Sequence, residues 1–93
     1  MEHYEKGWKE FLTLCLATKN TKALNELFDL LITPEEKESL SMRSLIIKEL
    51  ISGKKTQRKI AEDLNVSIAK ITRGSNALKR MRAGLLSLLK KVL

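Results

Sequence analysis

The sequence predicts a small all-α protein, and three observations lead to that fold class. Leu, Ile, Lys and Glu dominate its 93 residues, and with one Pro and four Gly the composition disfavours strands and turns. Aromatic residues make up only 4% of the chain, so any core has to be aliphatic. Apolar residues recur at helical spacing, the primary signal of amphipathic helices. A chain of this length has room for a single domain, residues 1–93.

Two amphipathic helices are expected before the single proline. The apolar stripe of the first consists of Trp8, Phe11, Leu12, Cys15 and Leu16. The polar stretch 18–21 ends this pattern and connects it to a shorter helix. The stripe of that second helix consists of Leu24, Leu27, Phe28 and Leu31.

A long third helix is predicted to begin at Pro34. Thr33 suits the N-cap, Pro34 suits the first helical position, and Glu36 can close a capping box. The helix should run to about Ser52, with Gly53 just past its end. Its apolar stripe is expected to consist of Leu40, Ile47, Leu50 and Ile51, with Leu45 and Ile46 on adjoining faces.

Residues 1–52 carry two features that a small monomer does not need. Arg43 occupies the slot between Leu40 and Ile47, where an apolar residue is expected, so it is a candidate functional residue. The helices are also apolar on more faces than so small a chain can bury alone, which favours a symmetric homodimer. A compact monomeric bundle is the alternative, but it leaves the extra Leu and Ile positions unexplained.

The charge of the chain is unevenly distributed. Residues 1–52 carry seven Lys and Arg against nine Asp and Glu, a net charge of −2. Residues 53–93 carry eleven against two, a net charge of +9. So basic a segment is costly to pack unless a polyanion lies against it, and nucleic acid or an anionic membrane surface is the natural candidate. A basic, solvated helical surface is the alternative.

Residues 56–81 fit a helix-turn-helix. Thr56 can cap a helix that runs through Leu64, Asn65 suits a turn that needs a left-handed residue, and Ser67 can cap the second helix. The apolar positions that close the motif are Ile60, Ala61, Leu64, Val66 and Ile71. An ordinary helical hairpin is the alternative, which the basic charge of the segment disfavours.

The same motif predicts which residues meet DNA. Its second helix enters the major groove, so the residues expected at base edges or phosphates are Ser67, Ile68, Ala69, Lys70 and Thr72. Gln57 and Arg58, at the start of the first helix, can reach the backbone or a guanine edge. The expected phosphate partners are Lys54, Lys55, Lys59 and Lys79.

Gly74 is the second unusual position. It lies inside the expected second helix of the motif, where Gly costs about 1 kcal/mol relative to Ala. It also stands where the hairpin pattern would place an apolar core residue. Two explanations are open from the spacing alone: a flat ligand packed against the glycine, or a kink or close helix crossing.

Catalysis, metal binding and membrane insertion are not expected. Cys15 and His3 are each the only residue of their type, which excludes an intrachain disulfide, a cysteine-based zinc site and a Cys/His catalytic pair. No carboxylate pair or nucleophile–base pair occurs at workable spacing. The apolar runs are too short to span a membrane, and the first residues lack the apolar core of a signal peptide. We therefore expect a cytoplasmic protein without enzymatic activity.

Three segments of the chain resemble the bacterial tryptophan repressor family. The string Ile71-Thr-Arg-Gly-Ser-Asn-Ala-Leu-Lys79 is similar to the signature of that family. Leu31-Ile-Thr-Pro-Glu-Glu, in front of the third helix, and Trp8-x-x-Phe11, in the first, are similar as well. The spacing between the three segments also matches, so the resemblance covers nearly the whole chain.

The resemblance implies a fold and a function. The fold is an intertwined homodimer of six-helix subunits, with residues 1–52 and a final helix at 84–93 as the dimerisation core and residues 56–81 as the helix-turn-helix. The function is that of a repressor of tryptophan biosynthesis or uptake genes, activated by L-tryptophan as corepressor and bound to double-stranded operator DNA. The ligand pocket would lie at the dimer interface, built from the long-helix region of one subunit and the recognition helix of the other.

The resemblance also assigns ligand-binding positions. Arg43 and Arg73 would sandwich the indole, because a planar guanidinium stacks on aromatic rings, and Arg73 would also lie near the ligand carboxylate. Gly74 would clear space for the ring, and Ile47 matches an apolar wall. The positions that meet the ligand amino group and the indole edge, largely through backbone carbonyls, are Leu30, Ile32 and Thr33. On the DNA side, family contact positions are matched by Arg58, Ile68, Ala69, Lys70 and Thr72.

Three positions depart from the family pattern. Ala77 stands where some members place a Ser whose hydroxyl holds the ligand amino group, Ala61 replaces a Lys that contacts DNA, and Lys70 replaces a Thr in the recognition helix. Two alternatives therefore stay open. One is a repressor-like paralogue that answers to another ligand or to none. The other is a nucleoid-associated helical DNA-binding module whose basic face only neutralises charge.

Overall fold

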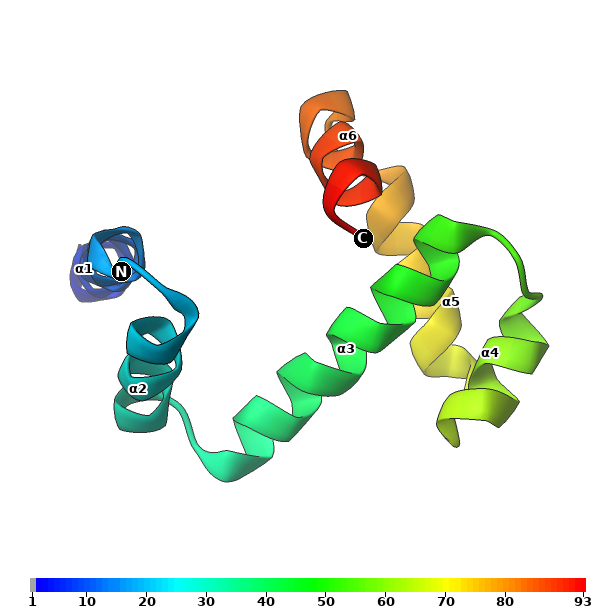
Figure 1. Ribbon diagram of the computed structural model, residues 1–93, viewed down its shortest axis with the longest axis horizontal. Helices are drawn as coiled ribbons and strands as arrows, with labels where there is room; N and C mark the ends of the chain where they lie inside the picture. The colour runs from blue at the N-terminus through cyan, green and yellow to red at the C-terminus, as the bar shows by residue number, and fades with distance from the viewer. Residues whose placement is uncertain (1) are drawn as a thin grey trace. The chain divides into compact units, whose positions relative to one another are not determined.

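The computed structural model describes residues 2–93, and within that range the chain forms six helices and no strand (Figure 1). The helices are α1 (Glu2–Ala17), α2 (Thr21–Leu31), α3 (Pro34–Ser52), α4 (Gln57–Leu64), α5 (Ile68–Lys79) and α6 (Ala83–Val92). The predicted all-α class is confirmed. The chain divides into two compact units, Met1–Glu38 and Ser39–Leu93, and each is described by itself.

Aromatic contacts join α1 to α2 in the first unit. The ring centroids of Trp8 and Phe11 lie 5.2 Å apart, and Phe11 stacks on Phe28 of α2 at 5.9 Å. Asn20 is the N-cap of α2, since its side chain accepts a hydrogen bond of 2.9 Å from the Ala23 N–H. No residue between positions 2 and 38 is buried, so the apolar stripes of both helices are only partly covered in the single chain.

The start of α3 confirms the predicted capping box. The Glu36 N–H donates to Thr33 Oγ1 at 3.1 Å, and the Thr33 N–H donates to Glu36 Oε1 at 2.8 Å. An ion pair of 2.8 Å between Lys37 and Asp29 joins this first turn of α3 to α2. At the other end, Gly53 follows the helix with a φ of +65°, the left-handed conformation expected there.

The core of the second unit consists of one isoleucine from each of three helices. Ile46 of α3 is 4% exposed, and Ile60 of α4 and Ile71 of α5 are fully buried. The residues packed against them are Met42, Leu50, Ala61, Leu64 and Val66. Asn65 connects α4 to α5 with φ 53° and ψ 51°, which confirms the predicted left-handed turn. The helix-turn-helix is therefore present, with the apolar residues expected to close it packed together.

Two expectations about single positions are wrong. The inward residue of α3 is Ile46, which the apolar pattern assigned to an adjoining face, while Leu40 is 45% exposed. The reason is that α5 approaches α3 beside Ile46. Ser67 occupies the N-cap of α5, but its side chain makes no capping hydrogen bond. By contrast, Thr56 caps α4 as expected, by accepting from the Lys59 N–H at 3.1 Å.

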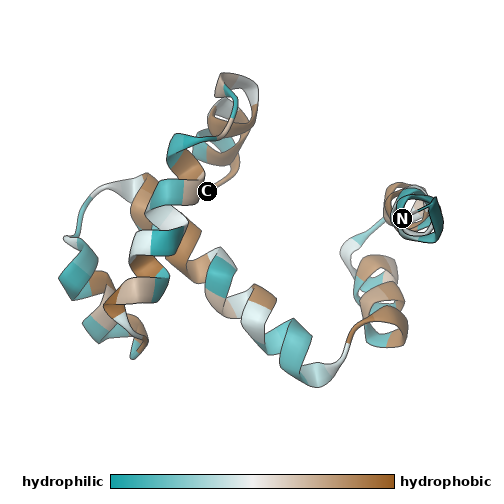
Figure 2. Cartoon of the chain, turned by 180° about the vertical axis from the view of Figure 1, so that it is seen from behind, coloured by the Kyte–Doolittle hydropathy of each residue, from teal (hydrophilic) through white to brown (hydrophobic). Residues whose placement is uncertain are grey.

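The last helix, α6, is apolar and largely uncovered. It begins at Ala83, one residue before the predicted helix, and Figure 2 shows hydrophobic residues along most of its length. Its exposed large apolar residues, with the one that follows it, are Leu85, Leu88, Val92 and Leu93. An apolar helix of this kind needs a cover that the single chain does not provide.

Candidate functional site

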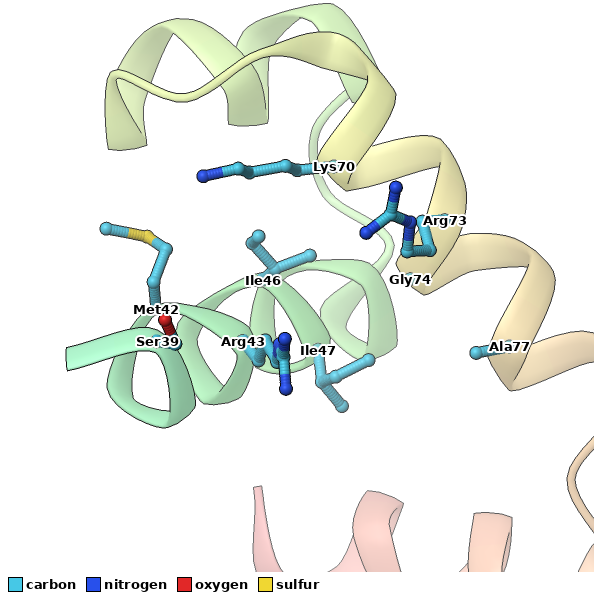
Figure 3. Close-up of a pocket in the computed structure, with 9 residues that line it drawn as sticks. All are labelled: Ser39, Met42, Arg43, Ile46, Ile47, Lys70, Arg73, Gly74 and Ala77. Atoms are coloured by element: carbon cyan, nitrogen blue, oxygen red, sulfur yellow. The ribbon is translucent and has the colours of Figure 1, made fainter. Parts of the chain in front are cut away.

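A pocket of about 340 Å³ lies between α3 and α5 (Figure 3). The residues that line it are Ser39, Met42, Arg43, Ile46, Ile47, Lys70, Arg73, Gly74 and Ala77. Within each helix these positions are three or four residues apart, the spacing that places side chains on one helical face. The pocket is thus formed where one face of α3 meets one face of α5, within a single unit of the chain.

Gly74 brings the two helices close together. A Cβ at this position would lie 3.2 Å from Ile46 Cγ2 and 3.3 Å from Leu50 Cδ1, which is tighter than ordinary contact. Close helix crossing, one of the two explanations left open by the sequence, therefore accounts for the glycine. Gly74 also borders the pocket, so the other explanation is compatible with the same geometry.

The pocket combines an apolar floor with a cationic rim. Met42, Ile46 and Ile47 supply apolar side chains from α3. Lys70 and Arg73 extend from α5 into the space between the helices, and Arg43 adds a third cation from α3 (Figure 3). No carboxylate lines the pocket, and the only hydroxyl in its lining belongs to Ser39. Such a site suits a ligand with a flat apolar body and a negative group.

Most of the predicted ligand residues meet in this pocket. The five that line it are Arg43, Ile47, Arg73, Gly74 and Ala77. One chain brings all five together, so these residues of the long helix and of the recognition helix meet within a single subunit. The reason is that the Gly74 crossing brings α3 and α5 of the same chain together. The other three predicted residues, Leu30, Ile32 and Thr33, belong to the first unit and do not line this pocket.

The sequence did not single out three lining residues, Ser39, Met42 and Ile46, and it assigned Lys70 to DNA alone. The helical spacing of these residues from Arg43 and Arg73 could have identified them. Ser39 and Ile46 lie four residues before and three after Arg43, and Lys70 lies three residues before Arg73. Once both arginines are placed in one pocket, these neighbours follow from the helix period.

The predicted DNA-contact residues lie at three places on the helix-turn-helix. The first turn of α4 holds Gln57, Arg58 and Lys59, and Lys79 ends α5. The N-terminal half of α5, with its N-cap, holds Ser67, Ile68, Ala69, Lys70 and Thr72. The Thr72 hydroxyl donates to Gln57 Oε1 at 3.0 Å, which joins the two helices at this surface. Ile68, an apolar side chain of this surface, is 50% exposed.

An ion-pair cluster joins α3 to α4 beside this surface. Lys55 Nζ lies 2.7 Å from Glu49 Oε2 and 2.8 Å from Asp63 Oδ2, and Lys59 Nζ lies 3.2 Å from Asp63 Oδ1. The hydrogen bonds to Asp63 and Glu49 raise the pKa of Lys55 above its ordinary value. Those from Lys55 and Lys59 lower the pKa of Asp63. Lys55 and Lys59, both expected at DNA phosphates, are therefore already paired within the chain.

Residues 2–93 contain neither a membrane-spanning helix nor a metal-binding cluster of side chains. None of the helices in this range is both long and apolar enough to cross a bilayer. Likewise, the described part of the chain contains no group of three or more His, Cys, Asp or Glu that could hold a metal ion.

Comparison with known proteins places the chain among repressors. The family model described as "Trp repressor protein" matches residues 6–93. A Chlamydia trachomatis serovar D protein named Trp operon repressor homolog is 51% identical over 75 residues, which cover 81% of this chain and 80% of that protein. A Chlamydia caviae protein of the same name is 49% identical over 78 residues, 84% of this chain and 77% of its own length. One from Photobacterium profundum is 41% identical over 88 residues, 90% and 85% of the two chains.

Proposed function

The chain belongs to the Trp repressor protein family, and on this premise we propose that it is a tryptophan-activated repressor that binds operator DNA as a homodimer. Family membership confirms the resemblance of the segment 71–79 and makes the protein a regulator rather than an enzyme. One observation carries the rest of the proposal. Arg43 and Arg73 line a single pocket on the second helix of a helix-turn-helix, so a ligand bound there touches the helix that would meet DNA.

The chemistry of the pocket supports L-tryptophan as the corepressor. The apolar side chains of Ile46 and Ile47 suit an indole ring, and the two guanidinium groups can stack on it or pair with its carboxylate. Gly74 and Ala77 complete this half of the site. A bound ligand would hold α5 in one orientation relative to α3 and so favour DNA binding.

The ligand amino group requires acceptors that this pocket lacks, apart from the Ser39 hydroxyl. In a homodimer, a second subunit can supply them through the backbone carbonyls of Leu30, Ile32 and Thr33. Leu30 is 79% exposed in the single chain, so this segment is accessible to another copy. The ligand would then bridge two subunits, which links corepressor binding to the dimer.

The basic half of the chain supports DNA as the partner. Residues 53–93 carry a net charge of +9 and contain the whole helix-turn-helix. Phosphate contacts from Arg58, Lys59 and Lys79 would supply affinity, while Ile68, Ala69 and Lys70 would meet base edges in the major groove. Thr72, Ser67 and Gln57 would position the surface against the backbone.

An operator-binding experiment tests this proposal. Duplexes preferred by the protein are selected from a random-sequence pool with L-tryptophan present, and their binding is then measured by mobility shift with and without the ligand. We expect L-tryptophan to tighten specific binding, and the selected duplex to tighten tryptophan binding by the same factor. Arg73→Ala should abolish this coupling but keep weak, salt-sensitive binding. Arg80→Ala, which removes the same charge outside the pocket, is the matched control.

Two outcomes would contradict the proposal in different ways. Equal binding with and without L-tryptophan would remove the corepressor role and point to a paralogue that uses another ligand or none. Equal binding to selected and random duplexes would point to a nucleoid-associated module. In either case the basic helix-turn-helix surface would still account for the salt dependence of DNA binding.

A further inference from the structure

Lys70 lies at a position shared by the pocket and the DNA surface. It is on the first turn of α5, among the predicted DNA contacts, yet its side chain also lines the pocket with Arg43 and Arg73 (Figure 3). None of the salt bridges formed by the described residues includes Lys70. Its charge is therefore available to a molecule in the pocket.

Three cations and no anion give the pocket a positive potential. An ammonium brought into it meets like charges, whereas a carboxylate meets opposite ones. The position of Ala77 adds to this bias, because a methyl group cannot accept a hydrogen bond from an ammonium. Two of the three cations belong to the proposed tryptophan site, and Lys70 is the additional one.

We propose that Lys70 is a specificity-determining residue of the ligand pocket, which favours the carboxylate of an indole ligand and opposes its amino group. The inference rests on the proposed function, because it concerns the same pocket. It assigns a preference among three related ligands. Indole-3-propionate, a carboxylate without the amine, gains most from Lys70. L-Tryptophan, which carries both groups, is affected little, and tryptamine, an amine without the carboxylate, is disfavoured.

Calorimetric titration of the full-length protein with these three ligands tests the assignment. Lys70→Met keeps the length of the side chain and removes its charge. We expect it to weaken indole-3-propionate about 2- to 5-fold, the size of effect expected for one partly solvated charge nearby, and to tighten tryptamine by a similar factor. Lys70→Arg should behave like the wild type. Lys48→Met removes a charge from α3 outside the pocket and should change none of the three affinities.

The opposite signs for the two analogues separate a charge effect from a structural one. A variant that merely distorted α5 would weaken all three ligands together, and that result would overturn the assignment. The same holds if the ratio of the two analogue affinities were unchanged in Lys70→Met while L-tryptophan still bound; the proposed function would then stand without it. If no ligand bound the wild-type protein saturably, the corepressor site itself would be refuted, and the assignment of Lys70 with it.

Discussion

Ala77 marks the place in the pocket wall where a hydroxyl would help an amino-acid ligand most. It lines the pocket on the same face of α5 as Arg73 and Gly74, but it offers no acceptor. The ligand amino group therefore depends on groups outside this wall. A hydroxyl at this position would change the affinity for ligands with an amine relative to the affinity for ligands without one.

Ala77→Ser is expected to strengthen L-tryptophan binding. A sound hydrogen bond from the ligand amino group to the new hydroxyl is worth about 0.5–1.5 kcal/mol. Indole-3-propionate has no amine and serves as the internal control, so its affinity should stay the same and the discrimination between the two ligands should widen. Calorimetry on wild type and variant measures both. An equal gain for the two ligands would show that the hydroxyl acts on something other than the amino group.

At the level of single residues, local patterns predicted the unusual members of the site, and the family resemblance added Ile47, Arg73 and Ala77. Arg43 and Gly74 stood out because each breaks a local pattern, a charge in an apolar stripe and a glycine within a helix. Ser39 and Met42 break no pattern, so nothing distinguished them before α3 and α5 were placed together. The sequence assigned Lys70 to the DNA surface alone. Its position near the start of α5 also places it in the pocket lining, which only the packing of α5 on α3 reveals.

Among the elements, local signals predicted where α3 and α4 begin and end, and long-range contacts decided which way α3 faces. The capping box at Thr33, the left-handed Asn65 and the Thr56 cap are all formed by residues within four positions of one another. The inward face of α3 is set instead by Gly74. Because α3 is apolar on several sides, its own periodicity could not select Ile46 over Ile47.

The ion-pair cluster between α3 and α4 predicts a dependence of stability on pH. Hydrogen bonds from Lys55 and Lys59 hold the pKa of Asp63 below its ordinary value of 3.8. A carboxyl with a lowered pKa in the folded state stabilises that state fully above pH 3.8. The contribution is lost as the pH falls through the lower, folded-state value. The described second unit should therefore lose part of its stability in this acidic range.

Asp63→Asn is expected to flatten that loss. The free energy of unfolding, measured by urea denaturation followed by circular dichroism, should fall less between pH 4 and pH 2 in the variant than in the wild type. Glu62→Gln is the control for a change of charge on α4. The Glu62 carboxylate lies one position earlier, and its Oε2 is 4.0 Å from Lys59 Nζ. Parallel pH profiles for wild type and Asp63→Asn would mean that the cluster contributes nothing to folding.

For the molecule as a whole, the distribution of apolar residues points to an assembly of two chains. The fully described range 2–38 buries no residue, and the core of the second unit has only three. Large apolar side chains remain exposed on α1, α2 and α6, among them Leu16, Leu30 and Leu88. The surplus of apolar faces was visible in the sequence, because it depends only on composition and helical period. Which copy of the chain covers each of these apolar faces depends on contacts between subunits. No local sequence pattern predicts such contacts.

A stable dimer is therefore expected at micromolar concentration. Its thermal unfolding should depend on protein concentration, because folding and association are then coupled. Sedimentation equilibrium measures the mass, and denaturation at several concentrations measures the coupling. A stable monomer of 10.6 kDa with a midpoint that does not vary with concentration would refute both the dimer and the shared ligand site.

The tilted contact of the Trp8 ring with Phe11 has a practical consequence for optical work on this protein. Trp8 is the only tryptophan of the chain; it is 53% exposed and does not line the pocket, which contains no aromatic residue. Its fluorescence therefore reports how the surface of α1 becomes covered. In a Trp8→Phe variant, the sole source of indole emission would be a bound ligand. One protein and its single-residue variant thus provide separate spectral signals for assembly and for occupancy of the pocket.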